Sequence, residues 1–486
     1  MLPWSPSMDA TTDSTASAGA PTVPRSSEEA LGLIWVFPQQ RFTPFQDREV
    51  VLGRGRECDV QIPGVLASRR HARLEHRNGV SLIGDLQSKN GTRVNGVRIA
   101  ECQLAEQDVV CLGEWVAVVG RARGEAGSAG PYELHEGLFG GVSLAEAFDR
   151  LRGVAPSDLS VVLVGETGTG KDLFARALHS LSGRGGPLVA INCAAVPEQL
   201  AEAELFGYRR GAFTGAIQDA LGHFRSAQEG TLFLDEVVEL DPSVQAKLLR
   251  ALESRAVTPL GQSRPVPADV RVVCAAQSPL AAAVEQGRFR ADLYARLRGL
   301  ELSLPPLRQR REEIVPHFLR FLYGETGGEL LSVAPEAIEL LCLYDWPMNV
   351  RQLSQVARQV ALLRGSAKRL DVTHLPSEIS GHCDSSEMPG DGAADLQDNQ
   401  AALRSEAEGR PSRAEQRWHA LRRRDDIELE RLLSALRRAH GNVTLAARRL
   451  GVSRQRAYRI ISAVPGLDLA ALRETSDGSP TRKPGN

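Results

Sequence analysis

The spacing of hydrophobic positions divides the 486-residue chain into three folded regions. From residue 31 to 119, short apolar or alternating runs are separated by Gly, Asn and Asp, a spacing typical of an all-β sandwich. Between residues 136 and 375, apolar runs such as LSVVLVG, TLFLDE and VRVVCAA alternate with helical stretches, which predicts a parallel α/β sheet closed by a helical tail over 308–364. Residues 425–465 hold three short helical patterns and predict an all-α domain.

Polar segments that are poor in apolar residues separate these regions. Residues 1–30, rich in Ser, Thr, Ala and Pro, and residues 466–486 predict disordered tails. Linkers are expected at two places, 121–135 and 376–424, and the second is expected to be flexible. The folded domains are therefore expected over 31–120, 136–375 and 425–465.

Bulk composition is that of a soluble globular protein, with 42% hydrophobic and 24% charged residues. No apolar run approaches the roughly 20 residues that span a bilayer, and the N-terminus has neither the basic start nor the apolar core of a signal peptide. We therefore expect a cytoplasmic protein without membrane contact. Because the net charge is only −2, any nucleic-acid-binding surface must be local.

The seven cysteines are scattered along the chain and never form C-x-x-C. This pattern argues against both a disulfide framework and a zinc site. We expect reduced and mostly buried thiols.

An apolar strand leads directly into a glycine-rich loop and a helix in LSVVLVGETGTGKD, residues 159–172. The loop has the form G-x-x-x-x-G-K, in which glycines let backbone N–H groups face phosphate oxygens and Lys171 reaches the outer phosphates. Asp172 replaces the usual Ser or Thr, so a hydroxyl that ligates Mg²⁺ is missing. The expected phosphate site consists of Gly165, Glu166, Thr167, Gly168, Thr169, Gly170, Lys171 and Asp172.

Two carboxylates follow a buried apolar run in GTLFLDEV. A bare carboxylate pair at the end of such a strand is costly unless it meets a cation. We expect Asp235 to hold Mg²⁺ through water and Glu236 to polarise the water that attacks the γ-phosphate.

These segments, in order and spacing with INCAAVPEQLAEAELFGYRRGAFTGA, RFRADLYARL, LPPLRQRREEI and WPMNVRQL, resemble the AAA+ domain of bacterial sigma-54-dependent transcription activators. The resemblance covers most of residues 136–375 and implies an ATPase with a helical lid that uses ATP and Mg²⁺. It also implies that the GAFTGA loop engages sigma-54, with Phe213 at its tip as a partner contact. The residues of this loop are Gly211, Ala212, Phe213, Thr214, Gly215 and Ala216.

The resemblance assigns further roles around the nucleotide. Asn192 matches the residue that switches Glu236 according to nucleotide state, and Arg290 and Arg296 match arginines offered to a neighbour's nucleotide, which implies a ring, in this family a hexamer. Arg351 matches the second sensor. Two departures stand out: Gln277 occupies the position of the first sensor Asn, and Met348 replaces the usual Gly.

The N-terminal region contains VVLGRGRECDV, ASRRHARL and GDLQSKNGTRVNGVRI, and it resembles a forkhead-associated (FHA) domain. The resemblance implies that loops at one end of the sandwich bind a phosphothreonine peptide, from a Ser/Thr kinase or another protein. His71, Gly91, Asn95 and Gly96 are expected to shape these loops, and Lys89 departs from a common Ser or Thr. The expected binding residues are Arg54, Ser68, Arg69 and Asn90.

The last helical patterns, in DIELERLLSALRRAHGNVTLAARRLGVSRQRAYRIIS, resemble the Fis-type helix-turn-helix domain found at the C-terminus of the same activators. Gly451 is expected to make the turn and Ser453 to cap the recognition helix. The recognition helix is expected to contact base edges or phosphates of double-stranded DNA at an enhancer-like site through Arg454, Gln455, Arg456, Tyr458 and Arg459.

The sequence thus predicts a transcription activator in which ATP hydrolysis by a ring drives promoter opening by sigma-54 RNA polymerase, under control of phosphothreonine binding. A narrower hypothesis places phosphorylated Thr11, Thr12 or Thr15 of the chain's own tail in the FHA pocket. Two alternatives stay open: a phosphopeptide-binding adaptor without ATPase activity, and a DNA-bound regulator that does not act on sigma-54.

Overall fold

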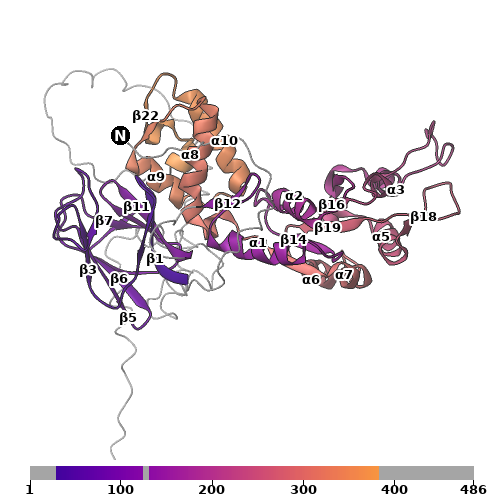
Figure 1. Ribbon diagram of the computed structural model, residues 1–486. Coiled ribbons are helices and arrows are strands. Elements are labelled where there is room, and N and C mark those ends of the chain that lie inside the picture. Colours follow the sequence, from indigo (N-terminus) through magenta and orange to yellow (C-terminus); the bar gives the residue numbers. More distant parts are fainter. Residues whose placement is uncertain (1–28, 124–130, 382–486) are drawn as a thin grey trace, which may run out of the picture. The chain divides into compact units, whose positions relative to one another are not determined.

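The computed structural model describes residues 29–123 and 131–381 of the chain (Figure 1). In these two ranges no helix is long and apolar enough to cross a membrane. Six of the cysteines lie in them as free thiols, four buried and two partly exposed. The C-terminal domain expected over 425–465 lies outside the described residues.

Residues 29–123 form a β-sandwich, referred to below as the sandwich. One sheet has the strand order β2-β1-β11-β10-β7-β8, and the other has the order β4-β3-β5-β6-β9. Trp35 and Trp115 are fully buried between them, and their rings meet edge to face with centroids 5.4 Å apart. The strands are β1 (Glu29–Phe37), β2 (Arg41–Pro44), β3 (Val50–Gly53), β4 (Val60–Gln61), β5 (Ala72–Arg77), β6 (Val80–Asp85), β7 (Thr92–Val94), β8 (Val97–Ile99), β9 (Glu101–Leu104), β10 (Val109–Leu112) and β11 (Trp115–Arg123).

The middle of the chain folds around a parallel sheet of order β15-β16-β19-β14-β20. Helices cover both faces, α1 and α2 on one and α3, α5, α6 and α7 on the other, which explains why its strands are continuous apolar runs. A hairpin of β12 (Tyr132–His135) and β13 (Leu138–Gly140) precedes the sheet. The further elements are α1 (Val142–Val154), β14 (Val161–Val164), α2 (Lys171–Ser182), β15 (Leu188–Asn192), η1 (Cys193–Ala195), α3 (Glu198–Phe206), α4 (His223–Ser226), β16 (Thr231–Asp235), η2 (Val237–Glu239), α5 (Pro242–Ser254), β17 (Ala256–Val257), β18 (Val266–Pro267), β19 (Arg271–Ala276), α6 (Leu280–Glu285), α7 (Ala291–Leu297) and β20 (Leu300–Ser303).

A helical lid, residues 314–381, follows the sheet and is joined to it by a connecting segment, residues 304–313. The connecting segment contains the short helices η3 (Leu307–Gln309) and η4 (Arg311–Glu313). The lid elements are α8 (Ile314–Glu325), β21 (Ser332–Val333), α9 (Pro335–Leu343), α10 (Asn349–Leu363), β22 (Arg369–Leu370), η5 (Val372–His374) and α11 (Ser377–Ser380).

The lid and the sandwich share one hydrophobic core. Alternate residues of β1, β2, β10 and β11 point away from the sandwich interior and pack with buried lid residues such as Phe318 and Ile338. This explains the sequence pattern of β1, β10 and β11, whose apolar runs LIWVF, VVCL and WVAVV are continuous because both faces of the sheet are buried. The sandwich residues of this core are Ile34, Val36, Phe42, Val109, Cys111, Val116, Val118 and Ala122.

Regular structure extends into both segments expected to be linkers. Strand β11 continues to Arg123 and β12 begins at Tyr132, inside the expected linker over 121–135. Helix α11 lies inside the segment 376–424, and its Ile379 is fully buried in the shared core. The sequences of these two segments are polar enough to predict linkers, but packing against the rest of the chain orders the parts that form β11, β12 and α11.

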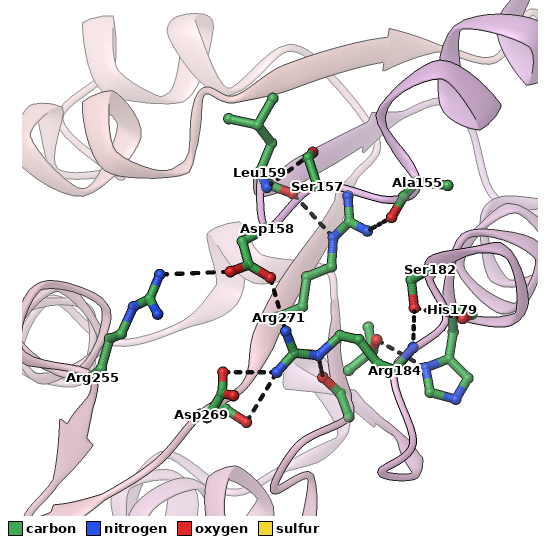
Figure 2. A network of polar contacts seen from close by, with 12 residues as sticks. Ala155, Ser157, Asp158, Leu159, His179, Ser182, Arg184, Arg255, Asp269 and Arg271 are labelled. Atoms are coloured by element: carbon green, nitrogen blue, oxygen red, sulfur yellow. Dashed lines mark hydrogen bonds and ion pairs between the residues drawn. The ribbon is translucent and has the colours of Figure 1, made fainter.

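A network of arginines fixes the amino-terminal edge of the parallel sheet (Figure 2). Arg271, at the start of β19, is 2% exposed and donates to the carbonyl oxygens of Val154 (3.0 Å), Ala155 (2.5 Å) and Leu159 (3.1 Å). These acceptors include the last carbonyls of α1, which are left without helical partners. Beside it, Arg184 bridges the carboxylates of Asp158 and Asp269.

We expect Arg271→Leu to destabilise the α/β domain by roughly 3 kcal/mol, because one buried and two partly buried hydrogen bonds from a charged donor are lost. Arg271→Lys, which keeps one donor and the charge, should cost less. Denaturant unfolding of the full chain, followed by a signal from the α/β domain, measures both. A matched control is Arg152→Leu, which removes an exposed arginine on α1. Equal stability of Arg271→Leu and wild type would contradict the role given to this network.

Candidate nucleotide site and partner-binding loops

The carboxyl ends of neighbouring parallel strands bring the predicted nucleotide residues to one edge of the sheet. The phosphate loop follows β14, Gln277 follows β19, and Asp235 and Asn192 end β16 and β15. These four strands are consecutive in the sheet, and Asn192 is paired directly with Asp235. Such an edge is where ligands bind in open α/β sheets.

The phosphate loop has the backbone conformation that its glycines permit. Gly168 and Gly170 have φ of 78° and 104°, and a Cβ at Gly168 would lie 2.2 Å from the carbonyl oxygen of Met348. Helix α2 begins directly after Gly170 with no side chain capping its first N–H groups, which leaves its positive end for an anion. Lys171 is 7% exposed, and its Nζ donates to the carbonyl oxygens of Gly165 (2.7 Å) and Glu166 (3.3 Å).

The side chain of Glu166 is directed to the connecting segment and the lid. Both of its carboxylate oxygens accept from Arg308, at 2.7 and 2.5 Å, and Asn349 Nδ2 lies 3.3 Å away. The hydrogen bonds from Arg308 hold the pKa of the Glu166 carboxyl below its usual range. Glu166 was expected as part of the phosphate site, and its carboxylate joins that site to the lid.

The two expected catalytic carboxylates lie at the end of β16. Asp235 Oδ1 accepts from the backbone N–H of Glu236 at 3.1 Å, and Glu236 has a φ of 53°, an uncommon conformation for a non-glycine residue. Gln277 Nε2 donates to Glu236 Oε1 at 3.0 Å. The side chain of Asn192, by contrast, accepts from the N–H of Ala194 at 3.0 Å and caps η1. The amide that contacts Glu236 is therefore that of Gln277.

Within the described ranges, no three His, Cys, Asp or Glu side chains lie close enough together to hold a metal ion by themselves. Asp235 and Glu236 nevertheless supply partly buried carboxylate oxygens beside the phosphate loop. That donor set fits a Mg²⁺ that keeps several waters and is held mainly by nucleotide phosphates and one or two carboxylates.

The three remaining arginines occupy different surroundings. Arg351 lies beside the phosphate loop, since a Cβ built at Gly168 would be 3.0 Å from the Cβ of Arg351. Arg290 lies just before α7 and Arg296 lies in its last turn, and both are exposed. Arg290 pairs with Asp292 at 2.7 Å, and Arg296 donates to the carbonyl oxygen of Leu252 at 3.2 Å. Their exposure leaves them available to another molecule.

Sequence reasoning missed three residues that join the phosphate loop to the rest of the chain. Asn349 is fully buried with a φ of 53°, donates to the carbonyl oxygen of Thr167 at 3.0 Å and accepts from Leu307 N–H at 2.6 Å. Arg308 binds Glu166, and Arg310 is 1% exposed and donates to the carbonyl oxygen of Thr169 at 3.2 Å. The sequence offered two signals, the polar Asn349 inside WPMNVRQL and the arginines Arg308 and Arg310 after two prolines. Neither signal identifies the residue that its side chain contacts.

The GAFTGA segment forms a loop after α3, where Figure 1 shows the chain extending away from the sheet. Tyr208 begins it with bridges to Ala220 and Leu260. Phe213 is 36% exposed, and its ring centroid lies 5.0 Å from that of Tyr208. Ile217 is 83% exposed. The loop thus presents apolar side chains to solvent on a base held by backbone pairing.

The predicted phosphopeptide residues come together at one end of the sandwich. Hydrogen bonds join three loops: Arg54 N–H to the Ser68 carbonyl oxygen (2.9 Å), Lys89 N–H to Ser68 Oγ (3.0 Å) and Asn90 Nδ2 to the Leu66 carbonyl oxygen (2.7 Å). Arg54, Arg69 and Asn90 are exposed. An arginine, a hydroxyl and an amide at one place can bind a phosphate and a peptide backbone.

Buried His71 holds these loops from behind. Its Nδ1 accepts from Ser68 N–H at 3.1 Å, and its Nε2 lies 3.2 Å from the Gly91 carbonyl oxygen. Burial lowers the pKa of His71, which favours a neutral ring. The expectation that His71 shapes the loops is confirmed. The DNA-contacting residues expected between Arg454 and Arg459 lie outside the described residues.

Four family descriptions match the chain in sequence order. They are "FHA domain" over residues 50–113, "Sigma-54 interaction domain" over 140–303, "AAA+ ATPase lid domain" over 308–391 and "Bacterial regulatory protein, Fis family" over 423–458. The chain is also similar to NtrX from Brucella abortus in complex with ADP, at 27% identity and a TM-score of 0.47, covering 66% of this chain and 69% of that one.

Similar curated proteins are bacterial regulators. WtsA, a probable regulatory protein of Pantoea stewartii, is 46% identical over 236 residues, which is 48% of this chain and 70% of WtsA. ZraR of Salmonella typhimurium is 40% identical over 62% of this chain, and UacR of Escherichia coli, a putative uric acid sigma-54-dependent regulator, is 45% identical over 46%. The chain spans 63% of the length of ZraR and 39% of UacR.

The match to the "Sigma-54 interaction domain" covers the α/β domain that carries the phosphate loop and the GAFTGA loop, and the other three matches flank it in order. The chain therefore belongs to the family of sigma-54-dependent transcriptional regulators, with an FHA sandwich, an AAA+ domain with its lid and a C-terminal Fis-type helix-turn-helix domain.

Proposed function

We propose that this protein hydrolyses ATP to drive promoter opening by sigma-54 RNA polymerase, and that phosphothreonine binding to its FHA domain controls this activity. The observation that carries the proposal is the presence in one domain of a glycine-rich phosphate loop with Lys171, of Glu236 at the same edge of the parallel sheet, and of an exposed GAFTGA loop. The proposal includes a ring, in this family a hexamer, because Arg290 and Arg296 are exposed and their polar contacts are with Asp292 and the Leu252 carbonyl, which leaves both available to a neighbouring subunit. The Fis-type domain would hold the ring at an enhancer-like DNA site.

The chain's own residues divide the hydrolytic work. Backbone N–H groups of the loop and the start of α2 bind phosphate oxygens, and Lys171 neutralises charge on the outer phosphates. Glu236 accepts a proton from the attacking water, and Gln277 orients its carboxylate. Arg351 and a neighbouring subunit's arginines stabilise charge that develops on the γ-phosphate. Mg²⁺, held through Asp235 and water, would supply further positive charge to the phosphates.

We expect Gln277→Leu to lower kcat for ATP hydrolysis about 10- to 100-fold with little change in KM, because the carboxylate of Glu236 loses the donor that fixes its orientation. Steady-state ATP turnover by the full chain measures this effect. In a Glu236→Gln background the same substitution should add almost nothing, since the two residues act as a unit. An unchanged kcat, or an equal loss in both backgrounds, would remove Gln277 from this role. Lys171→Ala should abolish turnover and serves as the inactive reference.

The GAFTGA loop is tested by Phe213→Ala in the full chain. We expect ATP-dependent open-complex formation by sigma-54 RNA polymerase on a sigma-54 promoter to be lost while ATP turnover stays within about twofold, because Phe213 contacts a partner rather than nucleotide. Leu362→Ala, which truncates another exposed apolar residue on α10, is the matched control and should leave opening intact. Turnover without opening in the wild-type chain would mean that the motor acts on another client.

Phosphothreonine recognition is tested by binding of a degenerate phosphothreonine peptide pool. We expect Arg54→Ala to weaken binding at least tenfold, because a charged hydrogen bond to phosphate is lost. Arg56→Ala, in the same exposed loop, should bind as wild type does. Isothermal titration or fluorescence polarisation measures this, with the unphosphorylated pool as reference. Equal affinity for both pools would exclude a phosphothreonine site, whichever residue is changed.

The alternative of an adaptor without ATPase activity predicts binding of the phosphorylated pool and no turnover sensitive to Lys171→Ala. The alternative of a regulator that does not act on sigma-54 predicts turnover without promoter opening. The intact nucleotide edge and the exposed loop favour the activator over both.

A further inference from the structure

We propose that the phosphopeptide loops of the sandwich and the phosphate loop of the AAA+ domain are energetically coupled inside one chain, through strand β7 and the connecting segment. The inference rests on the proposed function and names the route by which that regulation reaches the nucleotide. The sandwich is packed against the lid through a shared hydrophobic core.

The shared core fixes the sandwich on the lid. Val109, Val116 and Val118 of the sandwich are 0% exposed, although their side chains lie on the sheet face that points out of the sandwich. Their partners are lid residues such as Phe318 and Ile338, also 0% exposed. Separation of the two parts would expose this whole apolar face to water, so they move together.

The first polar contact across this interface comes from β7. Arg93 Nη2 and Nε lie 2.6 and 3.0 Å from Glu339 Oε2, on α9 of the lid. The side chains of Arg93 and Glu339 are 30% and 9% exposed, so this pair is partly removed from water. The expected peptide-binding residue Asn90 is only three residues before Arg93, and Gly91 between them is held by His71. A change in the peptide loop is thus transmitted along three residues to a lid contact.

The other end of β7 leads to a second contact. Asn95 directly follows β7, and its side chain donates to Asp108 at 2.9 Å and accepts from Val109 N–H at 2.9 Å. These bonds fix the turn between β9 and β10, where Gln107 has a φ of 70°. The Gln107 side chain accepts from Arg311 N–H at 2.7 Å and lies 3.3 Å from Glu312, both in the connecting segment.

From the connecting segment, arginines reach the phosphate loop. Arg311 Nε donates to the carbonyl oxygen of Arg308 at 3.1 Å, and the guanidinium of Arg308 holds the carboxylate of Glu166. Arg310, paired with Glu313 at 2.5 Å, donates to the carbonyl oxygen of Thr169. Hydrogen bonds and short stretches of backbone therefore run without interruption from the peptide loop to the phosphate loop.

Coupling of this kind is reciprocal: if the peptide changes the affinity for nucleotide by some factor, the nucleotide changes the affinity for the peptide by the same factor. The test is therefore a measurement of the affinities at both sites. The position of β7 sets both Arg93 and the turn that carries Gln107, so a peptide that shifts the loop containing Asn90 would act on both contacts.

The experiment measures the Kd of a fluorescent ADP analogue for the full chain, with and without saturating phosphothreonine peptide selected from the degenerate pool. We expect the peptide to change this Kd at least about fivefold in wild type, and the nucleotide to change the peptide Kd by the same factor. In Arg93→Met and in Gln107→Ala the factor should fall to within about twofold of unity, while each ligand alone still binds. Arg73→Met, which removes a surface ion pair with Glu101 on the far sheet, should keep the full factor.

Glu339→Gln supplies a second variant at the same contact, which keeps the test decisive if Arg93→Met misfolds. Peptide binding to wild type with an unchanged nucleotide Kd would overturn the coupling and leave phosphothreonine recognition intact. A full factor retained in Arg93→Met, Glu339→Gln and Gln107→Ala would overturn the proposed route. Failure of the phosphorylated pool to bind at all would overturn the phosphothreonine part of the proposed function and the coupling with it.

Discussion

Burial of both faces of one β-sheet is the constraint on which the described part of the chain depends. The sheet that contains β1, β10 and β11 closes the sandwich interior with one face and covers the lid with the other. A sandwich that only bound peptides could leave its outer face polar, as antiparallel sheets commonly do. Here the apolar outer face and the apolar surface of α8 and α9 satisfy each other, so the lid is incomplete without the sandwich.

The carboxyl edge of the parallel sheet, which carries the predicted nucleotide residues, is also held from two sides. The parallel sheet places the phosphate loop, Glu236 and Gln277 together, but the loop is held in place from the other side by groups after β20. Met348 and Arg351 approach Gly168 so closely that position 168 tolerates no side chain. Asn349 and Arg308 bind the neighbouring loop residues Thr167 and Glu166. Any movement of the lid against the sheet must therefore move the phosphate loop, which is what a nucleotide-driven machine requires.

Much of this was readable from the sequence because the signals are local. Glycines and a lysine after an apolar strand predict a phosphate loop, and G-R, S-R-x-H and N-G-T predict the FHA loops, which the structure gathers at one end of the sandwich. Long-range partners were not readable. Nothing beside Glu166 in the chain points to Arg308, and the substitution of Gln277 for Asn reveals its meaning only when its longer side chain is found at Glu236. The interface of Arg93 with Glu339 joins residues 246 positions apart.

The continuous apolar runs of β1, β10 and β11 were nevertheless a signal for the missed interface. A sheet with one wet face alternates, and LIWVF, VVCL and WVAVV do not. The same fact bears on how the AAA+ domain can be studied. Removing residues 29–123 would leave Phe318, Ile338 and their neighbours facing water, at roughly 25 cal/mol for each Å² exposed. Altered activity of such a truncated chain would then report lost packing as well as lost regulation, and only substitutions at the polar contacts separate the two.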